Sequence, residues 1–143
     1  MGLITGIAHV NVTVPPGTLE QAAKFYGETL GLTRAPVPAL QKETLAWFDI
    51  TPGGQQIHVS SHSTEGTTTN DFKASRHPCF KLGSREELQE LRERIWKHFE
   101  SKSEGSPSEA DKPGEEASGA KGVEYPTRFF ARDYAGNRLE FSL

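Results

Sequence analysis

The chain has 143 residues, of which 34% are hydrophobic and 24% charged, and this length and composition fit one globular domain with a core of its own. The formal net charge is −3, with no basic stripe and no apolar run of about 20 residues, which argues against nucleic acid and membrane partners. Cys79 is the single cysteine, so an internal disulfide is excluded, and together with the missing signal-peptide pattern it leads us to expect a cytoplasmic protein.

The first half of the chain predicts a strand, a helix and three further strands. Residues 6–14 alternate polar and apolar side chains, as a strand does. A helical pattern follows over 18–30, with Thr18 at the N-cap in capping-box spacing and Gly31 after the last turn. Three strands are then predicted, the last two joined by a glycine-pair turn, at 32–37, 44–50 and 55–61.

The second half repeats this order. We therefore expect a single domain, 1–143, that consists of module one, 1–62, and module two, 75–143. The helix of module two is predicted to start at a capping box formed by Ser84 and Glu87. The other elements predicted there are strands at 76–82, 125–133 and 137–143, and a short strand near Val123.

Residues 100–122 interrupt module two with six acidic side chains and three lysines. This acidic insertion accounts for the whole excess of negative charge and contains no aliphatic side chain larger than alanine. Such a composition cannot anchor a core, so we expect a disordered surface insertion. A functional lid is the alternative interpretation.

Four predicted strands carry a side chain able to bind a metal on their polar face. His9, His58 and His77 lie in mid-strand, and Glu140 lies in the last strand, each opposite an apolar face. Imidazole nitrogens together with a carboxylate suit zinc, nickel, iron(II) or manganese. The alternative is that these polar faces are merely solvated. The remaining histidines are expected in a loop, for His62, and beside the C-terminus of the second helix, for His98.

Five stretches of the chain resemble the vicinal oxygen chelate superfamily, which includes glyoxalase I, bleomycin- and fosfomycin-resistance proteins, methylmalonyl-CoA epimerase and extradiol dioxygenases. They are IAHVNVTV, AAKFYGETLGL, QQIHVS, RHPCFKL and FFARDYAGNRLEF, and the resemblance covers the chain except for the acidic insertion. It implies an α+β fold in which two βαβββ modules form a curved mixed-sheet cup around a divalent transition metal. It also implies the metal ligands His9, His58, His77 and Glu140. A homodimer is expected, and the resemblance leaves open whether the two modules pair within one chain or between two chains.

Two positions depart from the pattern of the superfamily. His58 stands where glyoxalase I usually has a glutamate that acts as a base, and Tyr134 replaces a proline in the last turn. The side chains expected to contact a small-molecule substrate are Asn11, Trp47, Gln56, Cys79 and Arg128. Core packing is the alternative for Trp47 and Cys79. The arginines that would bind a glutathione-like substrate are not distinguished from one another, and the candidates are Arg34, Arg128, Arg132 and Arg138.

The first functional hypothesis is a metal-dependent lyase or isomerase that acts on an oxygenated carbonyl compound. A metal with open positions chelates neighbouring oxygens of a substrate and stabilises an enolate, so that a modest base can remove a proton from carbon. Glu140 and His58 are the candidates for this base. The alternatives are an iron(II) ring-cleaving dioxygenase that uses His9, His77 and Glu140, and a non-enzymatic, resistance-type protein that binds a drug. The sequence names neither the substrate nor the metal.

Overall fold

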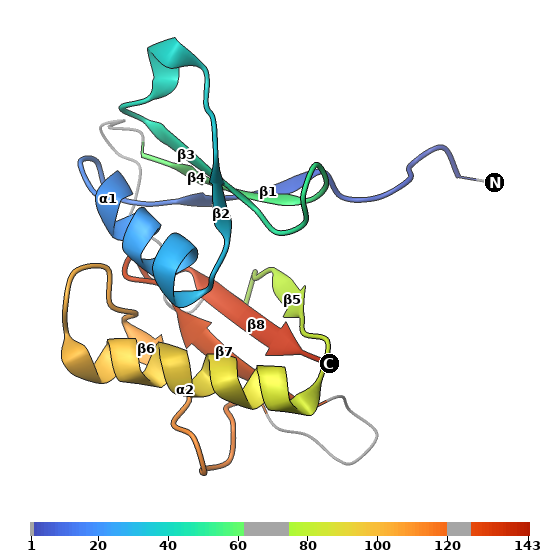
Figure 1. Cartoon of the computed structure of the whole chain (residues 1–143), viewed down its shortest axis with the longest axis vertical. Helices are drawn as coiled ribbons and strands as arrows, with labels where there is room; N and C mark the ends of the chain where they lie inside the picture. Colours follow the sequence, from blue (N-terminus) through green and yellow to red (C-terminus); the bar gives the residue numbers. More distant parts are fainter. Residues whose placement is uncertain (1, 62–74, 120–126) are drawn as a thin grey trace.

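Both halves of the chain fold into the same arrangement of strands around one helix. The computed structural model describes residues 2–61, 75–119 and 127–143, and Figure 1 shows its elements. The first half contains β1 (His9–Thr13), α1 (Leu19–Ala22) with its π-helical continuation η1 (Ala23–Thr29), β2 (Thr33–Ala35), the 3-10 turn η2 (Ala39–Gln41), β3 (Leu45–Asp49) and β4 (Gln56–Ser60). The second half contains β5 (Cys79–Lys81), α2 (Arg85–Ser101), β6 (Glu109–Ala110), β7 (Arg128–Arg132) and β8 (Arg138–Ser142).

The two sheets have the same topology. The strand order is β1-β4-β3-β2 in the first sheet and β5-β8-β7-β6 in the second. The first strand of each module pairs in parallel with the last one, and all other pairs are antiparallel. The prediction of an α+β fold built from two βαβββ modules is therefore confirmed. Within the described residues, β1 and β5 each have one unpaired edge.

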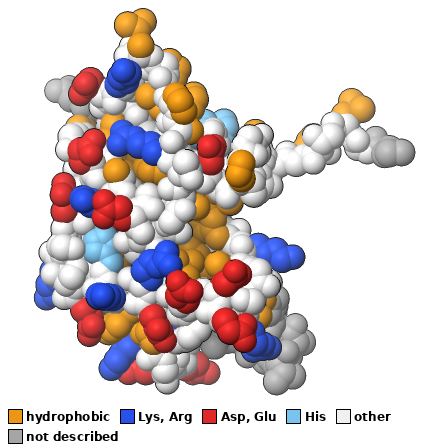
Figure 2. Space-filling view, in the orientation of Figure 1, with side chains coloured by type: hydrophobic (Ala, Val, Ile, Leu, Met, Phe, Trp, Pro, Cys, Tyr) orange, Lys and Arg blue, Asp and Glu red, His pale blue; other side chains and the backbone are white. Residues whose placement is uncertain are grey.

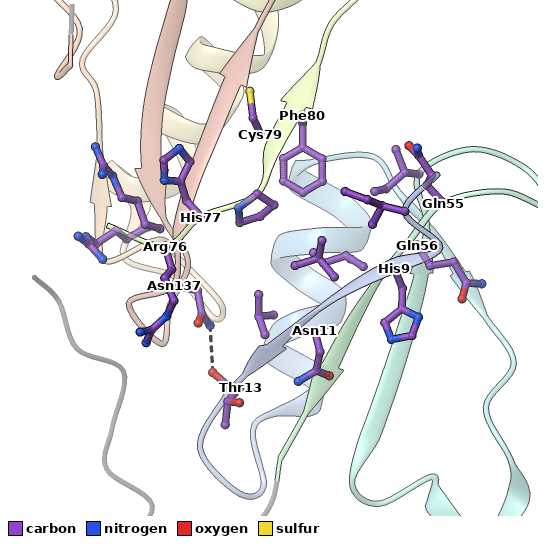
Figure 3. A pocket seen from close by; sticks show the side chains of 18 of the residues that line it. His9, Asn11, Thr13, Gln55, Gln56, Arg76, His77, Cys79, Phe80 and Asn137 are labelled. Atoms are coloured by element: carbon purple, nitrogen blue, oxygen red, sulfur yellow. Dashed lines mark hydrogen bonds between the residues drawn. The ribbon is translucent and has the colours of Figure 1, made fainter. Parts of the chain in front are cut away.

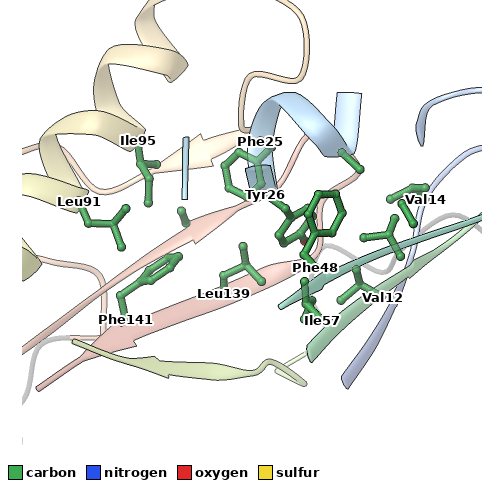
Figure 4. Close-up of a cluster of buried hydrophobic side chains, with 14 of the residues drawn as sticks. Val12, Val14, Phe25, Tyr26, Phe48, Ile57, Leu91, Ile95, Leu139 and Phe141 are labelled. Atoms are coloured by element: carbon green, nitrogen blue, oxygen red, sulfur yellow. The ribbon is translucent and has the colours of Figure 1, made fainter. Parts of the chain in front are cut away.

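The apolar faces of both sheets contribute to one shared core. In Figure 1, the helical segment α1–η1 lies between the first sheet and α2. Figure 4 shows the side chains that meet there, and they come from both modules: Val12, Val14, Phe25, Tyr26, Phe48, Ile57, Leu91, Ile95, Leu139 and Phe141. The alternation of polar and apolar residues that predicted the strands thus also predicted which side of each strand is buried. The polar sides lie away from this core.

The two helices start differently from one another. Ser84 caps α2 as predicted, because its Oγ accepts a hydrogen bond of 3.1 Å from the Glu87 backbone N–H. The capping box predicted at Thr18 is wrong, because the Thr18 hydroxyl donates to the Pro15 carbonyl at 2.6 Å and makes no cap contact. Gly31 has a positive φ of 78° where the first helical segment ends, as expected of a glycine stop. In the described residues, no helix combines the length and the apolar character needed to cross a membrane.

The described part of the acidic insertion is ordered, so the predicted disorder is wrong for residues 100–119. Residues 109–110 form β6, which pairs with β7 and occupies the sheet position that β2 has in module one. Arg92 of α2 donates hydrogen bonds to the carbonyls of Lys112 and Glu115, at 2.6 and 2.8 Å. The Asp111 carboxylate accepts the Phe130 backbone N–H at 2.8 Å.

The insertion is thus held by hydrogen bonds between side chains and backbone. The prediction of disorder failed because it considered only the burial of aliphatic side chains. Residues 120–122, the short strand expected near Val123, and His62 lie outside the described residues.

A buried polar network joins the two modules at the turn between β7 and β8. The Tyr26 hydroxyl donates to the Asp133 carboxylate at 2.6 Å, and Asp133 is fully buried. The same carboxylate accepts the backbone N–H groups of Ala135 and Asn137, each at 2.9 Å. The Asn137 side-chain amide also donates to the Thr13 carbonyl at 3.0 Å. This turn therefore fixes β8 relative to both the helix and the first strand of module one.

Candidate functional site

His77 and Glu140 form a close pair on the polar face of module two. His77 Nε2 lies 2.8 Å from Glu140 Oε2, and His77 Nδ1 lies 2.6 Å from the Ser75 carbonyl oxygen. Because a carbonyl oxygen only accepts, Nδ1 carries the hydrogen of that bond. Nε2 is therefore the nitrogen directed at the carboxylate. Arg128 Nη1 donates to the other oxygen of Glu140 at 3.1 Å, so an imidazole and a guanidinium hold this carboxylate from two sides.

Strand register explains why these two residues meet although the sequence separates them widely. Cys79 of β5 is the Cα partner of Glu140 in the parallel β5–β8 pair, and Glu140 N donates to the Pro78 carbonyl at 3.0 Å. His77 precedes Cys79 by two residues, so the two-residue period of an extended chain directs the His77 and Cys79 side chains to the same side of the sheet. Because Glu140 is the partner of Cys79, its side chain lies on that side too. Glu140 retains only 8% of its accessible surface, which limits the competition of water for its oxygens.

The polar face of module one carries a stack of three rings. The His9 and His58 ring centroids are 3.9 Å apart with an interplanar angle of 8°, and Trp47 stacks on the other side of His58 at 4.5 Å and 9°. Trp47 is the Cα partner of His58 in the β3–β4 pair. Trp47 is thus a support for His58.

A hydrogen-bond chain determines the tautomer of His58. Gln56 Nε2 donates to Asp49 Oδ1 at 2.7 Å, and Gln56 Oε1 lies 2.8 Å from His58 Nε2. A carboxylate only accepts, so the amide nitrogen of Gln56 faces Asp49 and its oxygen faces His58. His58 Nε2 is therefore the donor, and Nδ1 is the nitrogen with a free lone pair when the ring is neutral. Burial and the neighbouring His9 lower the pKa of His58, which favours this neutral form.

The stacking of His9 and His58 restricts how they could bind a metal. The lone pair of an imidazole nitrogen lies in the plane of its ring, so an ion bound by two histidines must lie close to both planes. Two nearly parallel rings 3.9 Å apart offer no such common position. Within the described residues, no three His, Cys, Asp or Glu side chains are grouped around one point. The four expected ligands thus lie as two pairs, one in each module, and within the described residues no group of three includes members of both pairs.

A groove of about 830 Å³ lies between the unpaired edges of β1 and β5. Figure 3 shows His9, Asn11 and Gln56 on one side of it and His77 and Cys79 on the other. The other expected site residues, Trp47, His58, Arg128 and Glu140, are not among its lining residues. The groove thus brings five of the nine expected residues into one space.

Some groove residues were missed or not distinguished in the sequence analysis. Asn137 and Arg76 line the groove without having been singled out, and Arg132 and Arg138 were two of four equivalent arginine candidates. One signal in the sequence could have separated these two from the other candidates. They stand on either side of the predicted turn at 134–136 and are Cα partners in the structure, which places two like charges on one face.

Cys79 and His98 have roles that the structure makes more specific. Cys79 is exposed as a residue, but partial burial of its thiol and the neighbouring Glu140 carboxylate raise the pKa of the thiol. A raised pKa reduces the thiolate fraction, so the geometry does not favour a nucleophile at Cys79. His98 connects two segments, because Nδ1 lies 2.7 Å from Thr29 Oγ1 and Nε2 lies 2.9 Å from the Glu104 carbonyl oxygen. It is therefore a structural residue.

Comparison with solved structures identifies the fold. A protein assigned to the glyoxalase family from Bacillus anthracis is 27% identical, with 99% of this chain and 97% of that chain covered and a TM-score of 0.68. A glyoxylase/bleomycin resistance protein/dioxygenase domain from Frankia sp. EAN1pec is 23% identical, with 98% of each chain covered and a TM-score of 0.68. The fosfomycin resistance protein FosX from Listeria monocytogenes is 15% identical, with 98% and 91% covered and a TM-score of 0.66.

No family model and no curated protein sequence matches the chain, so the shared fold is detected from structure. The repeated βαβββ topology, the polar faces that carry histidines and a glutamate, and these neighbours agree with one another. The chain has the glyoxalase-like fold of the vicinal oxygen chelate superfamily.

Proposed function

We propose that this protein is a small metal-dependent enzyme of the glyoxalase-like class, a lyase or isomerase that acts on an oxygenated carbonyl compound. The observation that carries the proposal is the contact between His77 Nε2 and Glu140 Oε2. His77 also donates from Nδ1 to a carbonyl, so both of its nitrogens face acceptors. A cation bound at both Nε2 and Oε2 would satisfy this contact. One nitrogen and one carboxylate oxygen are ligands that zinc, nickel, manganese and iron(II) accept.

The complete site is proposed to form between two copies of the chain. His77 and Glu140 lie in module two, whereas His9 and His58 lie in module one, and no described group of three includes ligands from both. The unpaired edges of β1 and β5 are sites where a further strand or copy could pair. Next to β1, the N-terminal arm extends away from the body in Figure 1, and its apolar side chains Leu3 and Ile4 are 98% and 91% exposed. A second copy would cover these side chains, so we expect a homodimer.

The residues of the site have separable roles in this proposal. A divalent metal bound at His77, Glu140 and a module-one histidine would polarise the carbonyl oxygen of the substrate as a Lewis acid. Arg128 holds Glu140 at Oε1, so Oε2, which faces His77, would bind the metal and would take a proton from the substrate carbon only when it leaves the metal. His58 is a second base, because its Nδ1 has a free lone pair while Nε2 is committed to Gln56. Asn11 and Gln56 line the groove and supply polar contacts to the substrate.

The ring stack supports a second candidate function. Since His9 and His58 are stacked in parallel, only one of the two rings can bind the metal. The metal ligands are then two histidines and one carboxylate. His9, His77 and Glu140 then match the donor set of iron(II) oxygenases. This set would suit a ring-cleaving dioxygenase, in which His58 only supports the His9 ring.

Metal content tests the proposal directly. The full chain without an affinity tag is purified without chelator and measured by elemental analysis beside His77→Gln and, as a matched control, His98→Gln. We expect about one transition-metal ion per chain in the wild type and in His98→Gln, and almost none in His77→Gln. Zinc or nickel would favour the lyase or isomerase, whereas iron would favour the dioxygenase. A wild type that takes up no metal even after reconstitution would contradict both enzymes and leave a resistance-type binding protein.

A further inference from the structure

The groove between β1 and β5 carries positive charge although the chain as a whole is acidic. The full sequence has 19 acidic and 16 basic side chains besides histidine. Among the residues that line the groove, three are arginines, Arg76, Arg132 and Arg138, and none of these described lining residues is Asp or Glu. On the face shown in Figure 2, by contrast, acidic and basic side chains are intermixed. The charge of the groove is therefore a local feature.

Two of these arginines face each other across the hairpin. Arg132 and Arg138 are Cα partners in the β7–β8 pair, an arrangement in which like charges destabilise a sheet. Arg132 is compensated, because its Nε lies 3.5 Å from Glu109 Oε2 and its Nη1 donates to the Gly136 carbonyl at 2.9 Å. Arg138 has no hydrogen-bond or ion-pair partner among the described residues. Among the described residues, its charge is therefore not compensated by an ion pair.

Arg138 is nevertheless held in place. Its guanidinium carbon lies 4.3 Å from the centroid of the Phe130 ring, so the aromatic face orients the cation and leaves its N–H groups available. A planar guanidinium with free N–H groups matches the two oxygens of a carboxylate, phosphonate or phosphate. Arg76 lies beside His77 at the same groove (Figure 3) and also has no partner of this kind among the described residues.

The position of Arg138 relates it to the His77–Glu140 pair. Arg138 and Glu140 are two residues apart in β8, so their side chains leave the same face of the sheet, with Cα atoms separated by roughly 7 Å. An anion bound by Arg138 would thus place the next few atoms of the same molecule near Glu140.

We propose that the groove binds an organic oxyanion, with Arg138 as the bidentate donor and Arg76 as the second cation. The shared chemistry is an acidic group with two or three equivalent oxygens, either a carboxylate or a phosphonate. The further statement that the substrate of the enzyme carries this group rests on the proposed function. Binding of the anion does not, because no metal ligand takes part in it.

The test uses the full chain, freed of metal by a chelating resin so that no soluble anionic chelator competes. Methylphosphonate and propionate are titrated separately while the shifts of backbone amide signals are followed by NMR, with neutral propionamide as the control ligand. The variants are Arg138→Gln, Arg138→Lys and Arg76→Gln. Arg34→Gln is the matched protein control, since Arg34 lies in module one with its side chain 45% exposed and only a 3.7 Å contact to Glu20.

We expect saturable binding of at least one anion, and a dissociation constant about tenfold or more higher in Arg138→Gln, as for loss of a charge-assisted hydrogen bond. Arg138→Lys should bind nearly as weakly, because lysine keeps the charge but lacks the fork. Arg76→Gln should weaken binding by a smaller factor, and Arg34→Gln should match the wild type. The tighter of the two probes identifies the acidic group.

Three results would overturn the proposal: no saturable binding of either anion, equal weakening in Arg34→Gln and Arg138→Gln, or binding of propionamide as tight as that of propionate. Metal content, measured on the same preparations before the resin step, separates this proposal from the previous one. Anion binding by a wild type that never held metal would refute the metalloenzyme and leave the anion site intact. A wild type that holds metal but binds no anion would refute the anion site and leave the metalloenzyme proposal intact.

Discussion

Asp133 makes a buried hydrogen bond between the two modules. Its carboxylate accepts hydrogen bonds from the Tyr26 hydroxyl and from the Asn137 side chain on one oxygen, and from two backbone N–H groups on the other. The residue is nonetheless 0% exposed. Burial raises the pKa of Asp133 above its usual value of 3.8, although these hydrogen bonds act in the opposite direction. The folded protein therefore binds the proton of Asp133 more tightly than the unfolded chain does.

This pKa shift predicts a pH dependence that Asp133→Asn removes. A carboxyl group with a raised pKa in the folded state contributes stability below its unfolded pKa, and this contribution is lost as pH rises through the folded pKa. The wild type should therefore lose stability relative to Asp133→Asn as pH rises above 3.8. Urea unfolding of both proteins at several pH values checks this, and Glu116→Gln, at an exposed carboxylate, is the control for loss of a carboxylate elsewhere. A wild-type advantage that grows with pH would contradict the predicted direction.

At the scale of single residues, the sequence predicted which side chains share a face but not how they are oriented. Period two assigned His9 and His58 to the polar side of neighbouring strands, and the structure stacks their rings there. The stack depends on Trp47 and on the Gln56–Asp49 chain that fixes His58. These contacts depend on which residues of neighbouring strands pair with each other. The polar–apolar pattern within one strand does not contain that information.

At the scale of elements, β6 shows what a composition argument overlooks. Strands with alternating apolar residues and the helix capped by Ser84 were predicted close to their observed positions. β6 has two residues, too few for any periodicity, and its segment is held by the side chains of Arg92 and Asp111. A charged segment can thus be ordered when its polar side chains reach backbone groups that would otherwise lack partners.

Asp111 is predicted to anchor this segment. Its Oδ2 accepts the backbone N–H groups of Phe130 and Ser118, at 2.8 and 3.1 Å. Asp111→Ala leaves both donors without this partner and should lower the free energy of unfolding by about 1–3 kcal/mol. Hydrogen exchange at the Phe130 and Ser118 amides should also become faster. Glu116→Ala, an exposed acidic residue of the same segment, is the control, and equal losses in both variants would show that Asp111 has no anchoring role.

At the scale of the whole molecule, the repeated module explains why the expected ligands lie as two pairs. Both apolar faces are used for the shared core, and each polar face carries its own pair. One face carries His9 and His58, and the other carries His77 and Glu140. Periodicity in the sequence assigned each residue to its face, but the relative placement of the two modules depends on contacts such as Tyr26–Asp133. This placement is the part of the site that the sequence could not predict.

Mixing two inactive variants tests whether a second copy completes the site. If module one of one chain meets module two of another, a mixed dimer of His9→Gln and His77→Gln chains has one site with both substitutions and one with neither. Random mixing makes half of the dimers mixed, so metal content should recover to about a quarter of the wild-type value although each variant alone binds almost none. Co-expression followed by elemental analysis measures this, with wild type and each variant expressed alone as references. If instead each site forms within one chain, every site in the mixture carries one substitution, and the metal content of the mixture stays at the level of the single variants.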